Sequence, residues 1–198
     1  MTLKKWFKLF WQASLIGAIA SLVTGIIFQV SGLDIEFKGA LDFILYLVIL
    51  LGYGMLVSVY SQLGFFAYLI TNYMANGVLS RRVWEYVQLV LAAIALLEVM
   101  FFRTFVSAHE NVWSDIWLGI GLLITAIIVA YFKVRMTNPR AWIPTIFFMI
   151  TVTVVEMIGG LQIGVDNATL FILIPLVVCN AYQILVLHRI TQRQEELS

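Results

Sequence analysis

The sequence predicts an all-α, polytopic membrane protein whose six transmembrane helices form one bundle in a single domain, 1–198. Two observations concern composition. Hydrophobic residues make up 62% of the 198 residues and charged residues 12%, whereas soluble domains are about 45–50% apolar and about 25% charged. The mean hydropathy is +0.98, and a soluble protein of this size has too small a core to bury so much apolar surface. These values exclude the soluble and disordered classes.

The third observation is a set of apolar runs that are long enough to cross a bilayer. A hydrocarbon core about 30 Å thick needs about 20 helical residues. The runs are continuously apolar, which indicates helices and not the alternating strands of a barrel. The predicted spans are about 9–30, 41–70, 83–106, 116–132, 141–161 and 168–187. The short connections between them leave no room for a soluble catalytic or sensor domain.

The first span follows Lys4, Lys5 and Lys8, as the apolar part of a secretion signal would. Its apolar stretch continues to Val30, which is too long for a signal peptide, so we expect a retained anchor. Small residues recur along it every four positions and would let another helix approach closely. They are Ala13, Gly17, Ser21 and Gly25. This stripe is expected to face another span of the chain or another protein.

The second span is longer than a bilayer requires and is expected to tilt or to extend past the interface.

Positive charges predict the orientation of all six spans, because cytoplasmic loops are enriched in Lys and Arg. Ten of the 12 Lys and Arg residues fall on one side, in the N-terminus, the second loop, the fourth loop and the C-terminal tail. They are Lys4, Lys5, Lys8, Arg81, Arg82, Lys133, Arg135, Arg140, Arg189 and Arg193. We therefore expect both termini in the cytoplasm and the protein in the cell membrane.

Three ionisable residues lie within predicted spans, where each costs about 2.5–3.5 kcal/mol on insertion scales and suggests a function. Glu98 and Arg103 belong to the third span and Glu156 to the fifth. Both glutamates follow the start of an outward-running span by the same distance, so their depths should match, nearer the outer face. Arg103 lies about 140° round a helix from Glu98. We therefore expect Arg103 to meet Glu156 across helices, or to extend towards the membrane surface.

These residues have two interpretations. They form a polar cluster that binds a ligand, carries a proton or receives a charged residue of a partner; alternatively, an ion pair joins two helices, or burial keeps the carboxyl groups protonated. We hypothesise further that Glu156 points into the bundle and is needed for coupling to a partner.

A second polar set lies in the inner half of the predicted membrane region. It consists of Gln62, Gln88, Asn180, Tyr182 and Gln183. Asn180 and Gln183 are three residues apart and share a helix face. Amides in hydrocarbon form hydrogen bonds between helices, each contributing about 0.6–2 kcal/mol. Joining helices is therefore the favoured role, and a binding site is the alternative.

Pro144 lies in the first turns of the fifth span, where a missing N–H costs little. Pro175 lies inside the sixth span and is expected to kink it or to free a backbone carbonyl for a binding site.

Several function classes have no support in the sequence. The net charge of +1 gives no reason to expect nucleic-acid binding. Cys179 is the single cysteine and is expected to be a small buried side chain. His109 and His188 fall on opposite sides of the predicted membrane and cannot share a metal. Catalytic motifs are absent, so we expect no enzymatic activity, no cofactor, and no catalytic, cofactor-binding or metal-binding residues.

Five runs together resemble the KinB-signalling pathway activation (KbaA) family of spore-forming bacteria. They are 61–68 (SQLGFFAY), 130–133 (AYFK), 143–149 (IPTIFFM), 155–156 (VE) and 174–183 (IPLVVCNAYQ). The resemblance implies a multi-pass membrane protein that a membrane sensor histidine kinase requires to signal into the sporulation phosphorelay. It implies no catalytic residues, but its runs contain Gln62, Glu156, Asn180 and Gln183.

The protein is thus expected to be a non-enzymatic accessory of a membrane sensor histidine kinase. Its expected partner is that kinase, and its surroundings are the lipid bilayer. The alternative is a small solute-binding subunit of a membrane transporter. Such a subunit would need a deep solute pocket, lined by the outer acidic residues, and an ATPase-driven partner.

Overall fold

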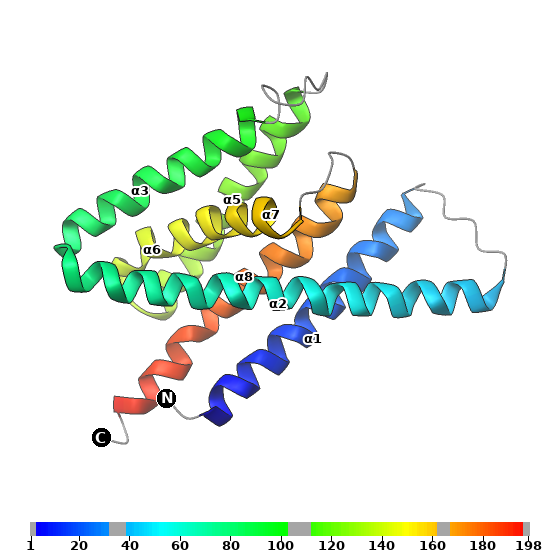
Figure 1. Cartoon of the computed structure of the whole chain (residues 1–198), viewed down its shortest axis with the longest axis horizontal. Helices are drawn as coiled ribbons and strands as arrows, with labels where there is room; N and C mark the ends of the chain where they lie inside the picture. Colours follow the sequence, from blue (N-terminus) through cyan, green and yellow to red (C-terminus); the bar gives the residue numbers. More distant parts are fainter. Residues whose placement is uncertain (1–2, 32–38, 103–111, 162–166, 196–198) are drawn as a thin grey trace.

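The computed structural model describes residues 3–31, 39–102, 112–161 and 167–195, and its regular structure in these ranges is helical throughout (Figure 1). The first helices are α1 (Leu3–Val30), α2 (Ala40–Val78) and α3 (Arg81–Leu97), which continues into the π-helical turn η1 (Glu98–Phe102). After α5 (Val112–Met136), a fifth membrane helix consists of a 3₁₀ turn η2 (Pro139–Ala141), α6 (Trp142–Phe147), a π-helical turn η3 (Phe148–Val152) and α7 (Thr153–Leu161). The last helix is α8 (Asn167–Glu195), which continues through Pro175.

Six of these helical segments are long and apolar enough to cross a membrane, which confirms the predicted all-α, six-span class. They are Trp6–Val30, Ala40–Val78, Arg81–Phe101, Asp115–Met136, Pro139–Met157 and Leu170–His188. The start of α1 and the end of α8 lie at the same end of the bundle (Figure 1), as an even number of spans requires.

Several helices extend beyond the apolar runs that predicted them. Helix α2 ends at Val78 instead of near residue 70, and α5 ends at Met136 instead of near residue 132. The assignment of Arg81 and Arg82 to a loop, and of Lys133 and Arg135 to the next inner loop, was therefore wrong, because these residues lie in α3 and α5. A helix satisfies its backbone groups internally and need not end where the apolar residues end.

The small-residue stripe of α1 packs inside this chain, against α2. A Cβ atom added to Gly17 would lie 2.5 Å from the carbonyl oxygen of Gly54, which leaves no room for a side chain. Gly25 lies equally close to Leu50 of α2. On the α8 side, the buried thiol of Cys179 lies 3.8 Å from the carbonyl oxygen of Ala13. The stripe thus lets α1 pack closely on α2 and α8, and the prediction of a buried cysteine is confirmed.

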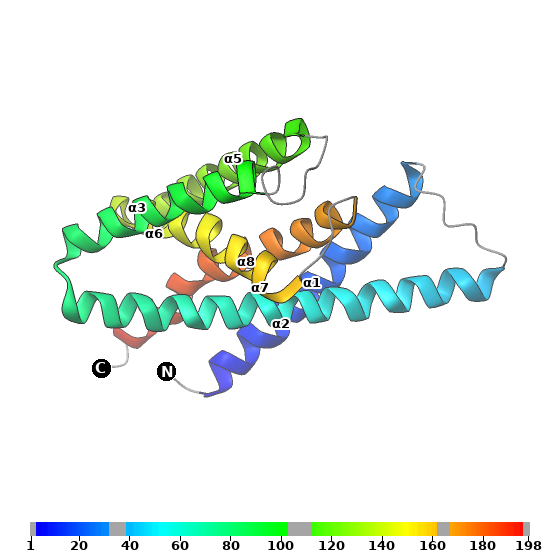
Figure 2. The ribbon, with the colours of Figure 1, turned by 45° about the horizontal axis from the view of Figure 1, so that its top comes forward.

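The helices form two groups joined by the fifth membrane helix (Figure 2). Helices α1, α2 and α8 pack mainly on one another, whereas α3, η1 and α5 pack together with α6. Direct contact between the groups, α2 with α3 and α5 with α8, is sparse. The N-terminal part of the fifth membrane helix, α6, packs on α3 and α5, and its C-terminal part, α7, packs on α2 and α8. The turn η3 lies between them and contacts both groups.

Aromatic rings fill the contact between α2, α3 and the N-terminal part of the fifth membrane helix. The ring of Phe148 lies 5.7 Å from Phe65 and 5.0 Å from Tyr68 of α2, measured between centroids. The ring of Phe147 lies 6.1 Å from Trp84 of α3. These edge-on and tilted arrangements are favourable for aromatic pairs, so they fix α6 and the start of η3 in place.

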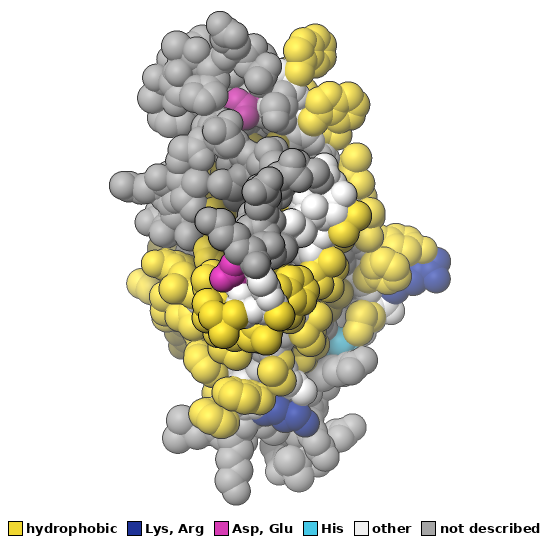
Figure 3. Space-filling view, turned by 90° about the vertical axis from the view of Figure 1, so that its right-hand side faces the viewer, with side chains coloured by type: hydrophobic (Ala, Val, Ile, Leu, Met, Phe, Trp, Pro, Cys, Tyr) yellow, Lys and Arg dark blue, Asp and Glu magenta, His cyan; other side chains and the backbone are white. Residues whose placement is uncertain are grey.

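Large apolar side chains cover much of the outer surface of the described helices, and they predominate among the described side chains on the face shown in Figure 3. Such a surface would be unfavourable in water but is ordinary where lipid is the solvent. The polar side chains of the described residues therefore lie mainly in the interior and at the helix ends. Those in the interior are the candidates for function.

Candidate functional site

A chain of hydrogen bonds between buried side chains joins α2, the fifth membrane helix and α8. The side-chain nitrogen of Asn180 donates to Glu156 Oε2 at 2.7 Å and to Thr153 Oγ1 at 2.9 Å. The amide oxygen of Asn180 accepts from Ser61 Oγ at 2.7 Å, and Ser61 Oγ accepts from Gln183 Nε2 at 2.9 Å. We call these five residues the polar core. Four of them are fully buried and Glu156 is 7% exposed, so their hydrogen bonds are formed away from solvent.

Glu156 fits into the polar core because α2 has a glycine at the facing position. A Cβ atom added to Gly64 would overlap the carboxyl group of Glu156 and would lie 2.8 Å from Val152 Cγ1. The absence of a side chain at Gly64 thus lets the carboxyl group reach Asn180 across the helix contact. This geometry agrees with the hypothesis that Glu156 points into the bundle.

The polar core contains two oxygen atoms without a hydrogen-bond donor among the described residues, Glu156 Oε1 and Gln183 Oε1. A buried acceptor without a donor costs about 1–3 kcal/mol. The core is therefore only partly satisfied by the described side chains, which makes its stability sensitive to any change in the packing of α7 on α2 and α8.

The structure does not bring the two predicted glutamates together. Glu98 is half-buried in η1, which packs on α5 and α3, whereas Glu156 lies on α7, which packs on α2 and α8. Within the described ranges, no hydrogen bond or ion pair involves the Glu98 carboxylate. The partner of Glu156 is the neutral amide of Asn180. Arg103, the expected cation, lies outside the described residues.

The second predicted polar set divides among separate helix contacts. Asn180 and Gln183 belong to the polar core, and Gln62 Nε2 donates to Ser58 Oγ at 3.0 Å and, at 3.5 Å, to Ser14 Oγ of α1. Gln88 Nε2 of α3 lies 3.5 Å from Asn72 Oδ1 of α2, which also accepts from Trp84 Nε1 at 2.8 Å. All of these contacts except that of Gln62 with Ser58 join different helices.

Tyr182 makes a further contact between helices, because its hydroxyl donates to Gln12 Oε1 of α1 at 3.0 Å. Lys133, which was expected in a loop, is only 6% exposed, and its amine donates to the carbonyl oxygen of Ile184 in α8. Both contacts join α8 to a neighbouring helix, α1 or α5, and are best explained by helix packing.

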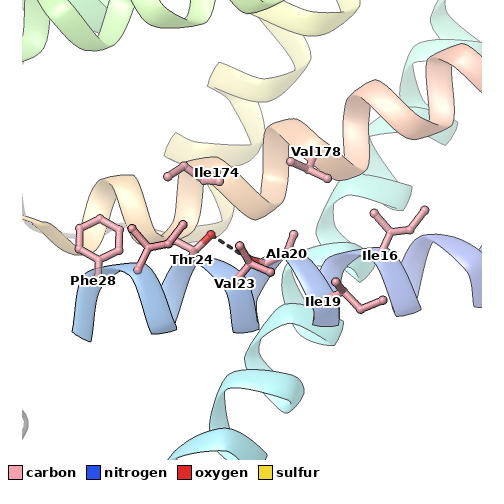
Figure 4. Close-up of a pocket in the computed structure, with 9 residues that line it drawn as sticks. Ile16, Ile19, Ala20, Val23, Thr24, Phe28, Ile174 and Val178 are labelled. Atoms are coloured by element: carbon pink, nitrogen blue, oxygen red, sulfur yellow. Dashed lines mark hydrogen bonds between the residues drawn. The ribbon is translucent and has the colours of Figure 1, made fainter. Parts of the chain in front are cut away.

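Two apolar grooves flank α8. The first has a volume of about 310 Å³ and lies between α1 and α8 (Figure 4). Its lining is apolar apart from Thr24, whose hydroxyl donates to Ala20 O of its own helix. The second, of about 520 Å³, lies between α5 and α8 and shares Ile174 and Val178 with the first. Neither groove is lined by a residue of the polar core or by Glu98, so these grooves suit apolar chains and not a charged solute.

Sequence reasoning missed three residues that hold Glu156 and Asn180 in place: Ser61, Thr153 and Gly64. Thr153 precedes Glu156 by three positions and Ser61 precedes Gly64 by three, so each pair shares a helix face. That spacing, together with the occurrence of Ser61 and Gly64 in one run quoted above, was the available signal. In the described part of the chain, no three His, Cys, Asp or Glu side chains are grouped so as to hold a metal ion.

The fold and the polar core together define a class: a polytopic helical membrane protein whose spans are tied by interior hydrogen bonds. Residues 17–190 match the model of a protein family described as KbaA, KinB-signalling pathway activation in sporulation. Since this match covers most of the chain, the protein belongs to the KbaA family. It is also 28% identical over 186 residues to the KinB-signaling pathway activation protein of Bacillus subtilis (strain 168), covering 91% of this chain and 93% of that protein. No solved structure matches the chain.

Proposed function

We propose that this protein is a non-enzymatic accessory, embedded in the cell membrane with both termini in the cytoplasm, that activates a membrane sensor histidine kinase at the start of sporulation. The observation that carries the proposal is the family match over residues 17–190, together with a relative named for the same pathway that aligns over 93% of its own length. Shared length at this level favours a shared role for the whole protein and not only for one segment.

The arrangement of the chain supports an accessory that acts through contacts. The connections between its described membrane helices are as short as residues 79–80 and 137–138, so a partner would be met within the membrane or at its surface. The described residues present mostly apolar side chains outward. A membrane-embedded partner, such as a sensor kinase with its own transmembrane helices, fits these two properties.

The polar core is the site that we propose for coupling. Its members lie on α2, the fifth membrane helix and α8. The core therefore joins helices that are far apart in the sequence around one buried carboxyl group. Polar groups within membrane helices are costly and are often functional. We propose that the core sets the relative position of these helices and thereby the surface offered to the kinase.

Copurification tests the proposed function. The tagged protein, expressed from its own gene in a spore-forming host and extracted in mild detergent, is expected to retain a membrane sensor histidine kinase. An unrelated six-span membrane protein of equal abundance serves as the control and should retain none. Absence of any kinase from the eluate, together with normal sporulation of a strain that lacks this protein, would contradict the proposal.

A further inference from the structure

We propose that the fifth membrane helix is a coupling element with two positions, that the π-helical turn η3 is its pivot, and that the polar core locks the position seen here. The inference rests on the proposed function. It describes how a conformational change in one group of helices would be passed to the other group, and from there to the kinase.

The location of the turn supports this inference. It lies where the fifth membrane helix leaves the group of α3 and α5 and joins the group of α2 and α8, which otherwise share few contacts (Figure 2). On the inner side, the ring of Phe147 contacts Trp84 of α3 and Tyr68 of α2, and Phe148, within the turn, contacts Phe65 of α2. On the outer side, the hydrogen bonds of Thr153 and Glu156 to Asn180 hold α7. The turn therefore separates α6, which packs mainly on α3 and α5, from α7, which packs on α2 and α8.

The geometry of a π-helical turn defines the second position. Such a turn accommodates one more residue than an α-helical turn of the same height. If it relaxed to an α-helix without loss of a residue, each residue beyond it would advance by about 100° and about 1.5 Å. The place of Glu156 would then be taken by Val155, which is now 62% exposed. The carboxyl group would leave Asn180, so formation of the polar core and the register of the helix are linked.

One residue of the turn contributes little to the position seen here. Phe148, Met149 and Ile150 are buried, and Val152 packs near Gly64. Thr151 is half-buried, and its hydroxyl oxygen finds no hydrogen-bond partner in the described part of the chain. Deletion of Thr151 should therefore convert the turn to an α-helix while both α6 and α7 keep their present neighbours. That variant would be fixed in the position with the polar core formed.

A second variant favours the other position. Exchanging the two side chains, Val155→Glu with Glu156→Val, places the carboxyl group where it meets Asn180 only after the helix has advanced by one residue. The two variants should therefore hold the fifth membrane helix in opposite positions. Deletion of Ile128 is the matched control, because this residue lies in a regular part of α5 and its loss would turn Val129 and Lys133 away from their buried places.

The experiment measures membrane abundance and kinase-dependent sporulation, with and without starvation, in strains that carry each variant. The Thr151 deletion and the exchange should both stay within about twofold of wild-type abundance, while the Ile128 deletion falls well below it. The first two variants should give fixed signalling levels that do not respond to starvation and that differ from each other by about tenfold.

Responses equal to that of the wild type in both variants, equal inactivity of both, or loss of the Thr151 variant from the membrane would each overturn the pivot. The wild type and a strain without the protein, assayed alongside, test the proposed function separately. Normal sporulation without the protein would contradict that function whatever the variants do.

Discussion

At the scale of single residues, the fit between Gly64 and Glu156 decides whether the polar core can form. Because Gly64 has no side chain, α2 leaves the space into which the Glu156 carboxyl group of α7 extends. Asn180 of α8 then donates a hydrogen bond to that carboxyl group. The three residues come from three helices and are in contact, so the effect on stability of replacing one of them should depend on the other two.

Replacing Gly64 by Ala should destabilise the protein by about 1–3 kcal/mol, because a methyl group would overlap the Glu156 carboxyl group and overpack the contact. Gly52→Ala is the control on the same helix, since a Cβ atom at Gly52 meets nothing within 4 Å; it should change stability by less than about 0.5 kcal/mol. Thermal unfolding of the purified proteins in detergent gives both values. Equal unfolding temperatures for the two variants would refute this account of Gly64.

Asn180 should be the most sensitive member of the polar core, because it bonds Ser61, Thr153 and Glu156 together. Asn180→Leu leaves all three without this partner, whereas Thr153→Val removes a single hydrogen bond. We expect a loss of about 0.6–2 kcal/mol for Thr153→Val and a clearly larger loss for Asn180→Leu, measured by the same unfolding assay. The reverse order would mean that Asn180 is not the centre of the network.

At the scale of the helices, the contact between α1 and α2 depends on small residues at their crossing point. Gly17 and Gly54 face each other so closely that neither has room for a side chain. Only one side of this contact could be predicted. The sequence of the first span showed the small-residue stripe, but the second span contains several glycines, and the sequence does not indicate which of them packs against the stripe. Only the packing of the two helices distinguishes Gly54 from Gly52.

Gly54→Leu and Gly52→Leu therefore form a matched pair, two residues apart on opposite faces of α2. The first should separate α1 from α2 and lower membrane abundance severely, because buried small residues at a helix crossing cannot be enlarged. The second adds an apolar side chain to an open surface and should leave abundance near the wild type. Immunoblotting of membrane fractions measures both, and comparable loss in both variants would contradict the described crossing.

The π-helical turns could not be predicted from the sequence. Apolar runs predict where a helix lies but give no sign of an extra residue within it. The inward direction of Glu156 could be expected from its cost in lipid, whereas its partner could not, because Asn180 lies 24 residues away on another helix. Arg103, proposed from charge alone, lies outside the described residues.

At the scale of the whole molecule, six spans and a same-sided pair of termini followed directly from composition and apolar run length. The division into two helix groups did not, because it depends on which apolar face packs on which neighbour. The positive charges predict the direction of insertion, because ten Lys and Arg residues gather on one side of the six spans.

Cysteine labelling in intact cells checks that direction. In a Cys179→Ser background, a cysteine replacing Glu36 should react with an impermeant thiol reagent, and a cysteine replacing Arg135 should react only after the cells are opened. The positive-inside rule gives this expectation. Labelling in the opposite pattern would invert the topology and with it the proposed cytoplasmic termini.

The most direct test of the central claim, that the polar core serves signalling, is kinase-dependent sporulation per unit of membrane protein for two variants of Glu156. Glu156→Gln keeps the size of the side chain and an oxygen that accepts from Asn180, so it should signal within about twofold of the wild type. Glu156→Leu inserts readily into a membrane helix but removes the hydrogen bond, and it should lose about tenfold or more of the signal. A Leu variant that is as abundant as the wild type and signals fully would contradict the claim.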